Sequence, residues 1–189
     1  PSLSLSQSSI VGGIRASVFG TVTLNGKAPV GGYVVNIASD KAAARVPASV
    51  TVPAGATSAT FSFVTDAVPS DQTANISVSA NSFSSSAPLL ITAPRLSDFT
   101  LSRPSIKKGK QNSGTVTIST RAPAGGLVIN LAVTNPATGV TVPATVTIPA
   151  GLLYGTFAVS TSASMTPGTV SITATLNGSS LPAQFDVTN

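Results

Sequence analysis

The stretch VPASVTVPAG at residues 46–55 returns almost unchanged as VPATVTIPAG at residues 142–151. In both copies a short run of alternating Val or Ile and Thr ends in Pro-Ala-Gly. Alternation with period two is the pattern of a half-buried β-strand, and Pro and Gly mark the turn that follows it. The stretch therefore predicts one strand and one turn, and the chain contains that unit twice.

The repetition extends outward from this stretch along the whole chain. GTVTL at 20–24 returns as GTVTI at 114–118, and APVGGYVVNI at 28–37 returns as APAGGLVINL at 122–131. A self-match at a nearly constant offset of about 95 residues indicates a duplicated domain. The stretch ITAP closes the first copy and RLSDF begins the second. The predicted domains are therefore residues 1–93 and 94–189.

Each copy shows period-two alternation and no convincing helical period. Ser, Thr, Ala, Val, Gly and Pro dominate, which is a strand-and-turn composition. Asn25-Gly26 and Asn177-Gly178 are predicted tight turns. About seven short strands per copy predict an all-β fold of two tandem immunoglobulin-like Greek-key β-sandwich domains. In the first copy we expect strands at 2–7, 16–24, 33–39, 46–52, 58–65, 74–80 and 87–92.

The alternation also predicts which side chains face the core. Most Phe residues fall on the inward positions, and Tyr33, which aligns with Leu127, is expected to be buried as well. In the first copy the inward set is predicted to be Val22, Leu24, Tyr33, Val35, Ile37, Val50, Val52, Phe61, Phe63, Ile76, Val78, Ala80, Leu89 and Ile91.

The pattern GTVTLNGKAPVGGYVVNI…VPASVTVPAGATSATFSFVT resembles bacterial immunoglobulin-like repeats of secreted and cell-surface proteins. The resemblance covers the chain twice. It implies a β-sandwich fold and a secreted or cell-surface location, and it implies little about activity, because this fold hosts many functions. The Cys…Trp…Cys core of antibody-type domains is absent, since the chain has no Cys and no Trp.

Composition argues against an enzyme. The chain has no His and no Cys, and its five acidic residues are all Asp. General acid–base catalysis needs a group that titrates near neutral pH. A carboxylate pair from Asp66 and Asp71 is conceivable, but both lie in a polar loop and are interpreted as solvated turn residues. A calcium ion takes six to eight oxygen ligands. The sequence near the junction of the two copies has Asp98 as its carboxylate, which is too few acidic ligands for a calcium site. We expect no cofactor and no metal.

The net charge of +5 makes nucleic acid a partner to consider. Such surfaces ordinarily combine basic and aromatic side chains, and here only Phe99 lies near the basic cluster, so we expect no nucleic-acid partner. No apolar run approaches the ~18 residues of a membrane-spanning helix. The chain shows no signal peptide and begins with Pro1, which suggests a processed product or an excerpt. The basic cluster comprises Arg95, Arg103, Lys107, Lys108 and Lys110.

Two segments are candidate assembly contacts. Leu152, Leu153 and Tyr154 form an apolar loop where the first copy has the small residues ATSA (56–59), and we interpret the loop as a packing contact, with a sugar site as the weaker alternative. Residues 1–9, with Leu3 and Leu5, lack the charges that usually protect an edge strand. These residues either add to a sheet of another subunit or fold back as the first strand of their own domain, and the sequence leaves both open.

Two classes of function remain. The first is a structural protein whose domains build an extracellular filament, fibre or stalk by self-association or by contact with neighbouring immunoglobulin-like domains. The second is an adhesion module that binds a glycan or a protein. Asn75 and Asn177 fit the glycosylation sequon, and the sequence leaves their modification open.

Overall fold

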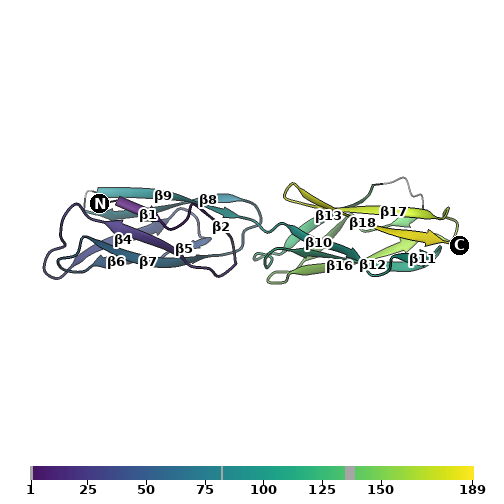
Figure 1. Ribbon diagram of the computed structural model, residues 1–189, viewed down its shortest axis with the longest axis horizontal. Coiled ribbons are helices and arrows are strands. Elements are labelled where there is room, and N and C mark those ends of the chain that lie inside the picture. Colours follow the sequence, from purple (N-terminus) through teal and green to yellow (C-terminus); the bar gives the residue numbers. More distant parts are fainter. Residues whose placement is uncertain (1, 82, 135–138) are drawn as a thin grey trace. The chain divides into compact units, whose positions relative to one another are not determined.

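The computed structural model describes residues 2–81, 83–134 and 139–189, and within these ranges it contains strands and no helix. The chain divides into two compact units, Pro1–Ala93 and Pro94–Asn189. Each unit is a sandwich of one four-stranded and one five-stranded sheet (Figure 1). The predicted fold class, all-β with two tandem immunoglobulin-like sandwiches, is confirmed.

Unit 1 has its four-stranded sheet in the order β1-β3-β7-β5 and its five-stranded sheet in the order β2-β9-β8-β4-β6. Every strand pair in the unit is antiparallel except β2 with β9, which is parallel. The strands are β1 (Ser2–Leu5), β2 (Ser9–Val11), β3 (Val18–Thr23), β4 (Tyr33–Ser39), β5 (Ala44–Arg45), β6 (Ser49–Val52), β7 (Ser58–Thr65), β8 (Gln72–Ala80) and β9 (Phe83–Thr92).

Unit 2 repeats this topology strand for strand. Its sheets run β10-β12-β16-β14 and β11-β18-β17-β13-β15. The strands are β10 (Leu96–Leu101), β11 (Ser105–Lys107), β12 (Gln111–Ile118), β13 (Leu127–Val133), β14 (Val140–Thr141), β15 (Thr145–Ile148), β16 (Tyr154–Thr161), β17 (Gly168–Leu176) and β18 (Ser179–Thr188).

The described part of each unit thus has nine strands where the sequence predicts about seven. The two additional strands of unit 1 are β2 and β5, which have three and two residues. Both lie where the chain changes sheets: β1 pairs with β3 in one sheet, and β2 pairs with β9 in the other. Runs this short cannot show a period-two pattern, so alternation alone does not reveal them.

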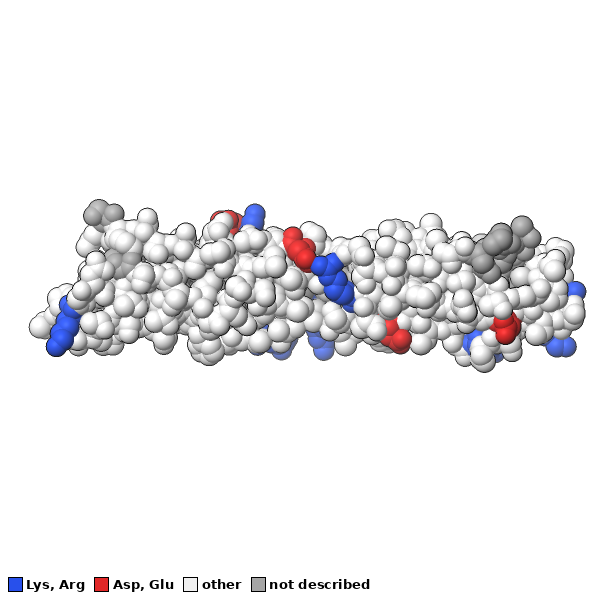
Figure 2. All heavy atoms as spheres, turned by 45° about the horizontal axis from the view of Figure 1, so that its top comes forward, with Lys and Arg blue, Asp and Glu red and all other residues white. Residues whose placement is uncertain are grey.

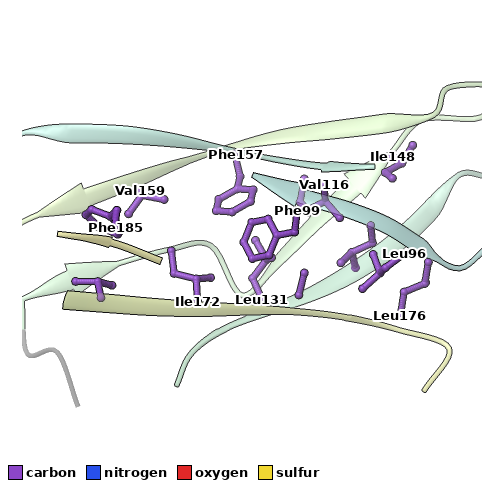
Figure 3. Close-up of a cluster of buried hydrophobic side chains, with 14 of the residues drawn as sticks. Leu96, Phe99, Val116, Leu131, Ile148, Phe157, Val159, Ile172, Leu176 and Phe185 are labelled. Atoms are coloured by element: carbon purple, nitrogen blue, oxygen red, sulfur yellow. The ribbon is translucent and has the colours of Figure 1, made fainter. Parts of the chain in front are cut away.

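The core of each unit lies between its two sheets, and the predicted inward face is confirmed. In β7 the burial alternates along the strand, with Phe61 and Phe63 inside. Leu24, Tyr33 and Val50 are the members of the predicted set that are only partly buried against the core of unit 1. In unit 2 the rings of Phe99 and Phe157 lie near the middle of the core, with centroids 5.9 Å apart (Figure 3).

The repeated Pro-Ala-Gly forms the same turn in both units. Gly55 and Gly151 have φ of 79° and 78°, a region that glycine adopts without strain. Each donates its N–H to the carbonyl of an Ala in the connection before the fourth strand of its unit, Ala28 or Ala122, at 2.9 Å. The turn therefore ties the end of one strand to a distant loop, which is why the phrase is repeated with so little change.

Of the two predicted Asn-Gly turns, one is confirmed. Asn177 (φ 48°) and Gly178 (φ 75°) make the two-residue turn between β17 and β18. The prediction at Asn25-Gly26 is wrong: neither residue has a positive φ, and the flanking strands β3 and β4 belong to different sheets. In unit 1 the turn between β8 and β9 contains Asn81, with φ 53°.

Candidate interaction surfaces

The loop that ends in β16 presents three successive apolar side chains. Leu152, Leu153 and Tyr154 are 45%, 40% and 54% exposed. Their backbone is firmly held: the carbonyl of Leu152 accepts the Ala122 N–H at 2.8 Å, and that of Leu153 accepts the Ile118 N–H at 2.9 Å. The loop is thus a fixed platform whose apolar side chains face outward.

Unit 1 has the same backbone platform with different side chains. The carbonyls of Ala56 and Thr57 accept the N–H groups of Ala28 and Leu24 at 2.8 and 2.7 Å. Ser58 stands at the position of Tyr154. Because Ala, Thr and Ser support the same backbone, the exposed side chains at 152–154 are not required for the turn. We call residues 152–154 the apolar loop.

The other predicted contacts, Leu3 and Leu5, belong to unit 1, so the two candidate sets lie in different units. Residues 2–5 pair antiparallel with β3, with Leu3 opposite Val22 and Leu5 opposite Gly20. Leu3 and Leu5 are half-buried and pack against the core of their own domain. The sequence left two arrangements open for this segment, addition to a sheet of another subunit or folding back onto its own domain. The structure has residues 2–5 folded back, and β1 forms an edge of its sheet.

The equivalent edge strand in unit 2 is built differently. The pairing of β10 with β12 contains a bulge between Leu96 and Asp98, and the carboxylate of Asp98 lies on an exposed residue of that strand. Charges and bulges discourage pairing with another chain. The register of β1 with β3 is continuous over residues 2–5, without such a bulge.

Phe19 is an exposed aromatic residue that the sequence analysis did not single out. It lies on β3 between Val18 and Gly20 and is 53% exposed, whereas Ser113 stands at this position in unit 2. The alternation around it, with Val18 and Val22 inside, could have shown that Phe19 points outward.

Asp66, Asp71 and Asp40 each make a separate contact that serves the fold. Asp66 pairs with Arg45 at 2.7 Å in an exposed ion pair, while Asp71 accepts the N–H of Ala93 at 2.8 Å. Hydrogen bonds from the backbone N–H and then the side-chain amide of Asn75 hold the pKa of Asp40 below its usual value. Within the described residues no three acidic, His or Cys side chains are grouped as a metal site would need.

The basic cluster near residue 95 also makes contacts within unit 2. The guanidinium of Arg95 donates to the carbonyl of Asn177, and the Lys108 ammonium contacts Asn189 Oδ1 at 3.3 Å. Buried Asn112 holds the backbone of Arg103 at both its N–H and its carbonyl. Charged side chains are sparse on the face shown in Figure 2.

The two sequons lie in different settings. Asn75 is on β8, and its side-chain amide donates to Asp40 at 3.0 Å. Asn177 occupies the β17–β18 turn, and its amide contacts the carbonyl of Pro94 at 3.5 Å. In the described part of the chain there is no helix of the length and apolarity needed to cross a membrane.

Comparison with known proteins gives similarity of structure only. No family model matches the sequence, and no curated protein matches it. The structure of the adhesin InvE of Yersinia pseudotuberculosis is similar to this chain, with a TM-score of 0.53 and 17% sequence identity. The alignment covers 99% of this chain and 58% of the InvE chain.

Two further solved structures are similar over nearly the whole chain. The D00-D0 domain of intimin covers 99% of this chain and 100% of its own, with a TM-score of 0.44 and 16% identity. The alignment with the Escherichia coli adhesin FdeC covers 98% of this chain and 62% of the FdeC chain, with a TM-score of 0.44 and 17% sequence identity. At these identities, the match to InvE establishes fold alone. The chain is a pair of immunoglobulin-like β-sandwiches whose structural neighbours include domains of bacterial adhesins.

Proposed function

We propose that this chain is a non-enzymatic module of a secreted or cell-surface protein, in which two immunoglobulin-like domains build a stalk or fibre. The observation that carries the proposal is that the fold of an adhesin, InvE, matches 99% of the chain. Both units have the same sandwich topology, so neither of them is set apart as a catalytic domain.

The surface chemistry supports a structural role. Asp66, Asp71 and Asp40 each have a contact that serves the fold. Exposed positions on the strands are mostly Ser and Thr, and charged residues make up 8% of the chain. Short side chains lose little rotamer entropy when surfaces meet, which favours close packing between neighbouring domains.

Two measurements test this function. An antibody against the chain should label intact cells of the source organism, and labelling that requires permeabilisation would contradict the location. In single-molecule pulling of the purified chain, we expect two separate unfolding events. Each should release roughly 300 Å of contour length, since the units have 93 and 96 residues and an extended residue spans about 3.3–3.6 Å. A single event for the whole chain would contradict two independent mechanical units.

The second candidate is adhesion through the apolar loop. It is favoured by a specific observation: the same backbone carries Ala56, Thr57 and Ser58 in unit 1 and three side chains that are 40–54% exposed in unit 2. Exposed neighbouring apolar side chains often mark a site of contact with another molecule. Tyrosine adds a ring and a hydroxyl that suit a glycan or a protein surface.

Unit 1 supplies the matched variant for this test. The triple substitution Leu152→Ala, Leu153→Thr and Tyr154→Ser gives the loop the residues that the same backbone carries at 56–58. We expect the variant to fold and, under the adhesion proposal, to lose binding to cells or to a glycan array. Binding that survives the triple substitution would exclude the apolar loop as the adhesive site.

A filament assembled by strand addition is the more specific form of the structural proposal. It is supported by the open edge of β1, which carries no charge, in contrast to β10 with its bulge and Asp98. Because Leu3 and Leu5 pack on their own core, pairing through the outer edge of β1 is the form that keeps unit 1 intact.

This form is tested with charge on the exposed face of β1. Ser2→Lys and Ser4→Lys alter exposed positions only, so the fold should remain. A charged edge strand should prevent polymer formation. Ser58→Lys, an exposed change on the inner strand β7, is the control. Polymers that form equally well with both sets of substitutions would contradict strand addition at β1.

A further inference from the structure

The outer face of the four-stranded sheet in unit 1 carries two neighbouring apolar side chains. Phe19 on β3 is 53% exposed, and Val64 on β7 is 37% exposed. Phe19 lies opposite Ser62 in the β3–β7 pairing, and Val64 is two residues further along β7. Diagonal neighbours of this kind are about 7–8 Å apart, which is within reach of an aromatic side chain. Phe19 and Val64 therefore form one apolar pair on a flat sheet face.

An ion pair borders these apolar side chains. Arg45 on the edge strand β5 lies opposite Val64. Its Nε donates to Asp66 Oδ2 at 2.7 Å, and both side chains are substantially exposed. One cation and one anion thus stand beside two apolar side chains. We call Phe19, Val64, Arg45 and Asp66 the outer patch.

The backbone beneath the outer patch is fixed. The Phe19 N–H donates to Ser6 Oγ at 3.0 Å, and the Phe19 carbonyl accepts the Ser6 N–H at 2.8 Å. The residues next to Phe19 and Val64 along their strands, among them Val18 and Phe63, are buried in the core of unit 1. The outer patch therefore projects from a rigid sheet, so little ordering of the backbone is needed when another surface meets it.

The duplication shows that the fold does not require these side chains. Unit 2 has the same strand pairings, β12 with β16 and β14 with β16. At the positions of the outer patch unit 2 carries short hydroxyl side chains, namely Ser113, Ser160, Thr141 and Ser162. Aromatic and Arg side chains are enriched where proteins contact one another. The outer patch is therefore a specific property of unit 1 that suits contact with another molecule.

The distribution of charge favours a second copy of this chain as that molecule. Unit 1 has four basic and three acidic residues, a net charge of +1, whereas unit 2 has six basic and two acidic residues, a net charge of +4. Two copies that meet through unit 1 therefore repel each other less than two that meet through unit 2.

The outer patch is also complementary to itself. A two-fold contact brings the same surface of both copies together, so that each group must suit its symmetry mate. Arg45 and Asp66 lie side by side, and a two-fold axis through the patch can place Arg45 of each copy against Asp66 of the other. The flat sheet faces can then pack on each other, as sheets do within a sandwich.

We propose that the outer patch is the contact through which two copies of this chain associate laterally, face to face about a two-fold axis. Phe19 and Val64 of the two copies pack together, and Arg45 of each copy pairs with Asp66 of the other. The proposal rests on the fibre function, because it supplies the lateral contact between chains. The contact is small and weak for one pair of chains, and it becomes strong where many copies lie along one fibre.

The first test is sedimentation equilibrium of the purified full chain. We expect a monomer–dimer equilibrium in the wild type. Phe19→Ser with Val64→Ser gives the outer patch the residues that unit 2 carries, so the fold should remain. This double variant should raise the dissociation constant about tenfold or more. Val34→Ser is the control, because Val34 is 58% exposed on the other sheet of unit 1, and it should leave the dissociation constant unchanged.

The second test exchanges the charges. In Arg45→Asp two acidic groups face each other across the axis, and in Asp66→Arg two basic groups do. Each variant alone should therefore dimerise about tenfold or more weakly than the wild type. In an equimolar mixture every Asp faces an Arg again, so the two variants should form a heterodimer with an affinity close to that of the wild type. Recovery on mixing also shows that both variants are folded.

The outcomes separate the explanations. Loss of dimers in the Ser variant together with recovery in the mixture supports the proposal. A wild-type chain that stays monomeric up to about 1 mM, or dimers that survive the Ser variant, overturns it. A mixture that stays monomeric overturns the two-fold pairing. Glycan binding by a monomeric chain that is lost in Phe19→Ser assigns the patch to a sugar and also overturns it. Because the purified chain is used, failure of the cell-surface location leaves these results unaffected.

Discussion

A glycine lies beneath an aromatic ring at the same place in each unit, and we expect its substitution to destabilise the domain. In unit 2, Gly114 on β12 is directly opposite Phe157 on β16. A Cβ atom at Gly114 would lie 2.3 Å from Cζ and 2.6 Å from Cε1 of that ring. The ring cannot easily move away, because it is 7% exposed and packs against Phe99.

The magnitude follows from two opposing effects. Overfilling a packed core costs about 1–3 kcal/mol. Replacing Gly by Ala restricts the unfolded chain and thereby stabilises the folded protein by about 0.4–1 kcal/mol where alanine can adopt the backbone conformation. Gly114 meets this condition because it does not have a positive φ. We therefore expect Gly114→Ala to lower the free energy of unfolding of unit 2 by about 1–2 kcal/mol.

The assay is a double-mutant cycle with Phe157→Leu, which removes the Cε and Cζ atoms. In that background Gly114→Ala should be neutral or stabilising, so the coupling should reach about 1–3 kcal/mol. Urea unfolding is followed by tyrosine fluorescence with Tyr33→Phe, which leaves Tyr154 to report on unit 2. Gly168→Ala is the control, because a Cβ there meets nothing within 4 Å. The same cost of Gly114→Ala with and without the ring would refute the steric explanation.

Other predictions address single contacts. Asn112→Val should cost about 1–3 kcal/mol in urea unfolding of unit 2, because it leaves the backbone N–H and carbonyl of Arg103 without their partner; no change would show that water replaces the amide. Because the folded-state pKa of Asp40 is lowered by Asn75, its contribution is present above the unfolded-state pKa and lost as pH falls through the folded value. The thermal midpoint of unit 1 should therefore fall more steeply below about pH 4 in the wild type than in Asp40→Asn, and parallel curves would contradict this. Asn177→Ala should cost about 1–2 kcal/mol and Asn177→Gly much less, since φ is 48° there; equal denaturation midpoints for the two variants would argue against backbone strain.

Much of the architecture could be predicted from the sequence because the signals are local or repeated. Period-two alternation places Phe61, Phe63 and Ile76 on an inward face wherever their strands pair, so burial follows without knowledge of the partner strand. The exposed apolar loop could also be found, because comparison of residues 152–154 with 56–58 shows large side chains where the other copy has small ones.

Features that depend on pairing between distant strands could not be predicted in this way. The sequence GTVT contains a glycine in each copy, but only the register places Gly20 opposite Phe61 and Gly114 opposite Phe157. Alternation likewise cannot tell that Asn25-Gly26 joins strands of different sheets.

The same division applies to the candidate surfaces. The sequence by itself determined two copies of one alternating pattern, and with them the two-sheet cores. Only the tertiary structure decided that residues 2–5 fold back onto β3 and that the pairing of β10 with β12 contains a bulge between Leu96 and Asp98. Alternation is a property of neighbouring residues, whereas sheet edges, register and pockets arise when segments far apart in the chain meet.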